Sequence, residues 1–240
     1  MATKTTNYWG VTRALGGWAL GAFLFGLLFK PIIQNIFPAD LRDDVIILAL
    51  PFVAYFAAIL LLFILGINLI SQRLHLSIPN RTHRAVEYTI IAGILFGIFA
   101  LFQPWTIGPY RFGFGLLLLS TLAFILWSHV MPRRAKDDSL QPPYTKNAVT
   151  AGLIVGLLIT ALIAGGFALT SRPKEPYGIR ERQWNFMRED QKVEIATKAN
   201  RDYFAGYLPF FLVYGLLPGL VGFFLIREFA TPKASEEASV

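Results

Sequence analysis

The residues of this sequence best suited to hold a cofactor are its three histidines, His75, His83 and His129. A neutral imidazole can bind haem iron or another transition metal, and it exchanges protons near neutral pH. Each histidine stands at the edge of an apolar run, so all three would gather at one side of a membrane. We take them as candidate ligands of a cofactor such as a haem or a quinone, whose identity stays unknown. No dedicated metal site is predicted, and we favour the interpretation that the histidines are ordinary polar residues of a membrane interface.

Other kinds of site chemistry find little support in the residue types. The chain contains no cysteine, which excludes thiolate metal sites, cysteine-held iron–sulfur clusters and disulfides. No P-loop, G-x-S-x-G, H-E-x-x-H or Rossmann glycine motif is present. We therefore predict no catalytic residue, and an enzyme acting on lipid would have to use the histidines.

The elements that position these residues are long apolar runs. Of the 240 residues 55% are hydrophobic and 15% are charged, whereas soluble domains are roughly 25% charged. The run 45–70 carries no charge, and about 20 residues suffice to cross the hydrocarbon of a bilayer. Five further runs follow the same pattern: 14–29, 87–103, 113–131, 148–170 and 206–226. Because the alternation of a β-barrel is absent, we predict an all-α polytopic membrane protein with a bundle of about six transmembrane helices.

The first apolar run, 14–29, has a second interpretation as a secretory signal peptide. It is the shortest run, and Lys30 and Pro31 interrupt it. No small-x-small cleavage site follows it, which favours an uncleaved signal-anchor helix.

Basic residues of the short loops predict the orientation, because Lys and Arg collect on the cytoplasmic side. One side receives Lys4, Arg13, Arg73, Arg81, Arg84, Arg133, Arg134, Lys136, Lys146, Arg227 and Lys233. The short loops of the other side hold only Lys30, Arg42 and Arg111. Both termini are therefore predicted to be cytoplasmic. The net charge of +7 then faces lipid headgroups, and membrane lipids rather than nucleic acid are the expected anionic partners.

These runs divide the chain into five parts. We expect a cytoplasmic N-terminal segment 1–13, five helices with short loops over 14–170, a polar extracytoplasmic segment 171–205, a sixth helix 206–226 and a flexible cytoplasmic tail 227–240.

The segment 171–205 is the one long polar stretch between apolar runs. No proline or glycine interrupts residues 179–205, so we expect a single helix of about 40 Å that ends at Gly206. Apolar residues recur on roughly one side of this helix, and four of them are candidates for binding a partner subunit: Trp184, Met187, Ile195 and Tyr203. A solvated connector and a lid over a substrate pathway are the alternatives.

Small residues recur at every fourth position of the run 148–170. They are Ala148, Gly152, Gly156, Thr160, Ala164 and Ala168. Small residues let helix backbones approach closely in lipid, where there is little hydrophobic drive for association. The stripe predicts packing inside the bundle, or a contact with another subunit through Gly152 and Gly156.

The predicted helices carry no Asp, Glu, Lys, Arg or His near their middle. Ion-coupled carriers, proton pumps and voltage sensors need such residues, which are costly in hydrocarbon and are kept for function. We therefore expect an integral membrane accessory or scaffold subunit of a larger membrane protein complex, such as an electron-transfer or other energy-transducing complex, with no chemistry of its own. The alternative is a transport protein, as a permease-like subunit or a small channel, that is not driven by intramembrane proton-binding residues.

Overall fold

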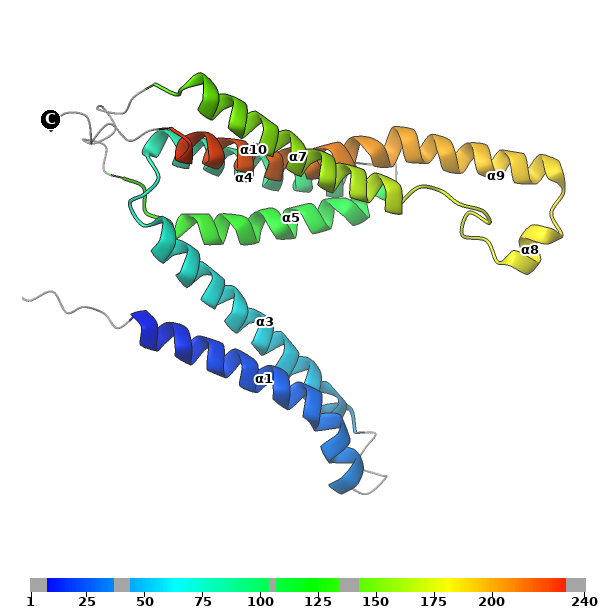
Figure 1. Cartoon of the computed structure of the whole chain (residues 1–240). Helices are drawn as coiled ribbons and strands as arrows, with labels where there is room; N and C mark the ends of the chain where they lie inside the picture. The colour runs from blue at the N-terminus through cyan, green and yellow to red at the C-terminus, as the bar shows by residue number, and fades with distance from the viewer. Residues whose placement is uncertain (1–7, 37–43, 104–106, 134–142, 232–240) are drawn as a thin grey trace, which may run out of the picture. The chain divides into compact units, whose positions relative to one another are not determined.

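The computed structural model describes residues 8–36, 44–103, 107–133 and 143–231, and within them the chain forms helices and no strand. Figure 1 shows the helices in chain order. They are α1 Tyr8–Ile36, α3 Val45–Leu74, α4 Asn80–Phe102, α5 Ile107–Ser128, α7 Lys146–Thr170, α8 Glu181–Asn185, α9 Glu189–Asp202, the π-helical turn η1 Tyr203–Tyr207 and α10 Leu208–Phe229. The predicted terminal segments reach into residues 1–7 and 232–240, which lie outside the described residues.

Five helices are long and apolar enough to cross a membrane. They are Trp9–Ile33, Val45–Leu74, Asn80–Phe102, Lys146–Thr170 and Glu189–Phe229. Part of α5 forms a shorter apolar helix, Phe112–Ser128. The chain is therefore an all-α, multi-pass integral membrane protein, while the sixth crossing and the orientation stay predictions.

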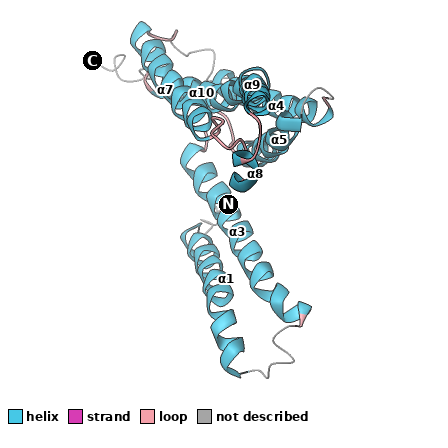
Figure 2. Ribbon diagram, turned by 90° about the vertical axis from the view of Figure 1, so that its right-hand side faces the viewer, coloured by secondary structure: helices cyan, strands magenta, loops and turns pink. Residues whose placement is uncertain are grey.

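The described helices form two compact units, and the first consists of α1, α3 and the stretch His129–Met131. Helices α1 and α3 lie side by side (Figure 2). A Cβ atom at Gly26 would lie 2.9 Å from the ring of Tyr55, and Asn68 Nδ2 donates to Thr12 Oγ1 at 3.4 Å. The N-cap Asp44 accepts the backbone N–H of Ile46 at 2.8 Å, which fixes the start of α3. This unit is a helical hairpin.

The second unit holds α4, α5 and all helices from α7 onward. Its helices pack with their backbones close together. Helix α4 packs on α5, and α7 packs on α10. A Cβ atom at Gly97 of α4 would lie 2.8 Å from the backbone nitrogen of Leu117 in α5. Between α7 and α10, a Cβ atom at Gly156 would lie 2.8 Å from the carbonyl oxygen of Gly219. Four residues of the small-residue stripe, Ala148, Gly152, Gly156 and Ala164, are thus buried inside this unit.

Aromatic side chains fill the place where α5, α7 and α10 meet. The fully buried Phe211 lies edge-on to Phe112, with ring centroids 5.1 Å apart, and stacks on Phe167 at 5.7 Å. Tyr214 lies within 5.7 Å of Phe167 and 6.2 Å of Phe112. This cluster holds the three helices together near the end of α7 from which the polar segment departs.

The polar segment does not form the single helix expected over residues 179–205. Helix α8 ends at Asn185, and α9 begins only at Glu189. The reason is a local helix start, in which Gln191 Oε1 accepts the backbone N–H of Arg188 at 3.4 Å. Glu189 and Asp190 occupy the first turn of α9, where the helix dipole favours negative charge. These side chains favour a new helix over continuation of α8.

The predicted helix end at Gly206 is also wrong. Helix α9 runs through η1 into α10, so Glu189–Phe229 is one helical column of 41 residues, about 60 Å long at 1.5 Å per residue. Gly206 lies buried within the π-helical turn. Helix α9 extends past the C-terminal end of α7 (Figure 1). We call residues 171–207 the arm.

Candidate functional site

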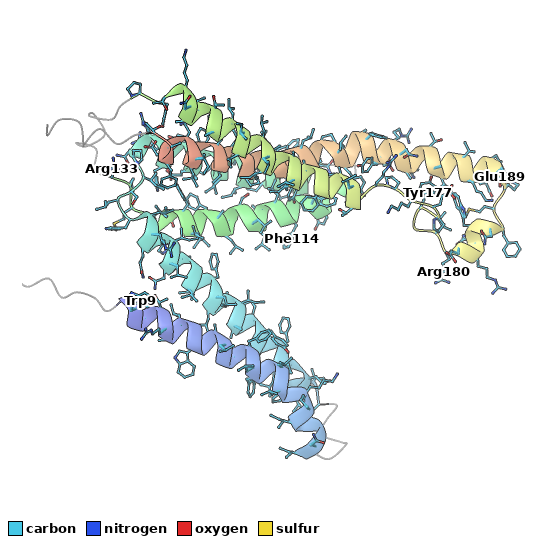
Figure 3. The ribbon with its side chains drawn as sticks, viewed as in Figure 1. Trp9, Phe114, Arg133, Tyr177, Arg180 and Glu189 are labelled. Carbon is cyan, nitrogen blue, oxygen red and sulfur yellow. The ribbon has the colours of Figure 1, made fainter. Side chains whose placement is uncertain are left out.

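The arm is partly held together by its own side chains. The ring of Trp184 in α8 lies edge-on to that of Tyr177, with centroids 5.6 Å apart, and Lys192 Nζ of α9 lies 5.9 Å from the Trp184 ring centroid. The same Lys192 Nζ pairs with Glu189 Oε1 at 2.8 Å. Figure 3 labels Tyr177, Arg180 and Glu189 along this part of the chain. Trp184, a predicted docking residue, is therefore half-buried within the arm.

Tyr203, a second predicted partner-binding residue, connects the base of the arm to α7. Its side chain is buried, and its hydroxyl donates to the carbonyl oxygen of Ala168 at 2.7 Å. The other two predicted docking residues, Met187 and Ile195, are half-buried. The predicted apolar stripe is thus not the most exposed apolar surface of the arm.

Three other apolar side chains of the arm are exposed. Phe186, in the turn between α8 and α9, is 85% exposed, and Val193 and Phe204 are 63% and 62% exposed. Val193 and Phe204 are about three helical turns apart, which places them near one side of the column. Sequence reasoning missed Phe186 because its exposure arises from the break between α8 and α9.

Charged residues flank the exposed Phe186 along the chain. Arg188 pairs with Asp190 at 3.1 Å, and both side chains remain exposed. Arg180 and Arg182 of the α8 region are exposed as well. In protein–protein contacts, large aromatic side chains that become buried contribute much of the binding energy.

The histidines divide between the two units. His83, in the first turns of α4, stacks on Trp127 with ring centroids 5.1 Å apart, and its Nδ1 lies 3.9 Å from Glu87 Oε2. Trp127 Nε1 also donates to the carbonyl oxygen of His83 at 3.1 Å. His75 follows α3, and the carbonyl oxygen of His129 accepts a hydrogen bond from Ser71 Oγ at 2.7 Å. A cofactor site shared by the three histidines stays a prediction.

Within residues 8–36, 44–103, 107–133 and 143–231, no cluster of three or more histidine, aspartate or glutamate residues is arranged to hold a metal ion.

The two glycines proposed for contact with another subunit face α10 of the same chain. A Cβ atom at Gly152 would lie 2.8 Å from the carbonyl oxygen of Phe223, and both Gly152 and Gly156 are buried. Because α10 covers them, this geometry favours packing within the chain over the intersubunit contact.

A polar cluster at one end of the second unit joins three helices. It consists of Arg81 and Thr82 at the start of α4, Tyr144 just before α7, and Arg227 and Glu228 at the end of α10. The guanidinium carbons of Arg81 and Arg227 lie 3.9 Å and 3.8 Å from the centroid of the Tyr144 ring. Such cation–π contacts stabilise by about 0.5–2 kcal/mol each, more as they are desolvated. We call these five residues the polar cluster.

Hydrogen bonds complete the polar cluster around Glu228. Its Oε2 accepts from Thr82 Oγ1 at 2.7 Å and from the Tyr144 hydroxyl at 3.2 Å, and it lies 3.6 Å from Arg81 Nε. Thr82 is fully buried and the Glu228 side chain is 13% exposed. The sequence already assigned Arg81 and Arg227 to the same side of the membrane, but the contact through Tyr144 depends on the fold.

Comparison of the whole chain with protein-family models, with curated proteins and with solved structures found no match in any of the three.

Proposed function

We propose that this chain is an accessory or scaffold subunit of a larger membrane protein complex and contributes no chemistry of its own. The observation that supports the proposal is the arm. It places an aromatic side chain, Phe186, 85% exposed in the turn that precedes the helical column Glu189–Phe229. An exposed aromatic side chain on a well-packed support is suited to bind a partner, since little conformational entropy is lost on contact.

The distribution of charge in the spans also supports a role without ion transport. Charged residues of the predicted crossings stand towards the ends of the helices, as Lys146 does in α7 and Arg227 in α10. Charge-coupled transport needs ionisable groups at depth. The orientation that we propose puts both termini in the cytoplasm and the arm on the opposite side, because the sequence assigns most Lys and Arg of the short loops to the side of Arg81 and Arg227.

Site-specific photo-crosslinking tests the docking role of the arm. A photoreactive phenylalanine analogue at position 186 should give one discrete larger product in native membranes. The same analogue at Phe102 is the matched control, because that side chain is 82% exposed but lies at the end of α4, outside the arm. We expect no discrete product from position 102.

Purification supplies the second readout. The wild-type chain, extracted in mild detergent, should co-purify with the crosslinked partner, and Phe186→Ala should weaken that association at least about tenfold, as loss of an interface hot spot does. An absorption spectrum of the purified assembly identifies an electron-transfer partner. A chain that purifies alone and forms no product at position 186 would contradict the proposal and favour the transport alternative.

A further inference from the structure

The polar cluster contains more positive than negative charge. Glu228 is its one carboxylate, and that group already accepts from Thr82 and Tyr144 and lies beside Arg81. Arg227 is the second cation of the cluster. The carboxylate therefore balances one guanidinium, and the charge of the other is left over.

The Arg227 side chain is held by aromatic rings rather than by an anion. Its guanidinium carbon lies 3.8 Å from the ring centroid of Tyr144, 5.0 Å from that of Phe223 and 5.2 Å from that of Phe224. Among the described residues no ion pair or hydrogen bond to its side chain is formed, and its buried Nε has no hydrogen-bond partner. Rings attract a cation but accept none of its in-plane hydrogen bonds. Arg227 is thus positioned to bind an anion.

The depth of Arg227 indicates which anion. It lies in the last turn of α10, next to Tyr144, which directly precedes the N-cap Thr145 of α7. Arg81 lies in the first turn of α4. The ends of membrane-crossing helices lie at the level of the lipid headgroups, where phosphate is the abundant anion. The first turn of α7, with Lys146, adds positive potential nearby.

We propose that Arg227, which shares the Tyr144 ring with Arg81, forms a binding site for a phosphate group. A guanidinium stacked on a ring keeps the N–H donors at its edge in one plane, which fits two phosphate oxygens at once. The phosphate can come from a lipid headgroup or from a free phosphate ion. This site lies on α4, α7 and α10 and is separate from the docking surface of the arm.

Native mass spectrometry of the full chain in detergent tests this site. The probe is phosphatidylglycerol, and diacylglycerol with the same acyl chains is the control ligand without phosphate. We expect the wild-type chain to retain phosphatidylglycerol but not diacylglycerol. Arg227→Gln should weaken retention about tenfold or more, the loss typical of a charge-assisted contact. Arg227→Lys should fall between these two, because it keeps the charge but loses the planar fork, and it provides the measurement if the Gln variant does not fold.

Arg84→Gln is the matched control variant. It removes one positive charge from the same turns of α4, but Arg84 is exposed and lies outside the polar cluster. We expect its retention of phosphatidylglycerol to equal that of the wild type. Equal losses in Arg84→Gln and Arg227→Gln, or no loss in the Arg227 variants, would overturn the proposal.

Inorganic phosphate distinguishes the two sources of the ligand. If added phosphate displaces phosphatidylglycerol from the wild type, the site accepts the free ion as well as the headgroup. If it does not, while the Arg227 variants still lose the lipid, the site takes phosphate only within a lipid. If neither phosphatidylglycerol nor inorganic phosphate binds the wild-type chain, the proposal fails.

Discussion

The contact between α7 and α10 allows a direct test of how this membrane protein is held together. We consider Gly156→Ala, which adds one methyl group on the buried side of α7. The new Cβ atom would lie 2.8 Å from the carbonyl oxygen of Gly219 and 3.1 Å from Cβ of Phe223. The nearest atom belongs to the backbone of α10, so no side chain can rotate away, and the two helices have to separate.

The size of the effect follows from a comparison with a second glycine of α7. A Cβ atom at Gly165 would meet no heavy atom within 4 Å. Both substitutions improve helix propensity, by up to about 1 kcal/mol, so this gain cancels in the comparison. The remaining difference is the cost of overpacking, about 1–3 kcal/mol. We expect Gly156→Ala to unfold more readily than Gly165→Ala by that free energy.

Reversible unfolding in mixed micelles, followed by helical circular dichroism as the denaturing detergent increases, measures both free energies. Adding Gly219→Ala to Gly156→Ala should cost less than the sum of the two single changes, because a Cβ at Gly219 would lie 2.7 Å from the Gly156 carbonyl oxygen across the same contact. Equal stability of Gly156→Ala and Gly165→Ala would refute the close approach of the two backbones.

Two further predictions concern the arm and the orientation. Tyr203→Phe removes the hydrogen bond to Ala168 and should destabilise the base of the arm by about 0.5–1.5 kcal/mol, seen as faster amide hydrogen exchange in residues 203–207, whereas Tyr207→Phe should leave that exchange unchanged. The chain has no cysteine, so single substitutions report on topology without background. An impermeant maleimide should label Gln183→Cys in intact cells and Asn147→Cys only after permeabilisation, and the reverse pattern would contradict the predicted orientation.

The long apolar helices could be predicted from the sequence, because hydropathy and length alone identify them. The predicted run 45–70 lies within α3, Val45–Leu74, and the run 148–170 lies within α7, Lys146–Thr170. Hydropathy does not predict the polar ends of the helices. Helix α4 begins at Asn80 instead of near residue 87, since its first turns are polar yet helical after Pro79.

The details of the arm and of the polar cluster depend on information that the apolar pattern lacks. A start signal for α9 is present in the sequence, in Glu189, Asp190 and Gln191, and attention to helix capping would have found the break before it. By contrast, Tyr144 meets Arg81 and Arg227 only through the packing of α4, α7 and α10. No spacing along the chain predicts that contact. Likewise, the sequence does not show that Gly152 and Gly156 pack against α10.

The π-helical turn η1 determines which way the side chains of α9 point relative to those of α10. Because α9 and α10 share a column through Tyr203–Tyr207, the direction in which Val193 points is determined by the number of residues in that turn. Each residue of an α-helix contributes about 100° of rotation. Deleting Ala205 alone would therefore turn the side chains of α9 around the column relative to the buried glycines of α10.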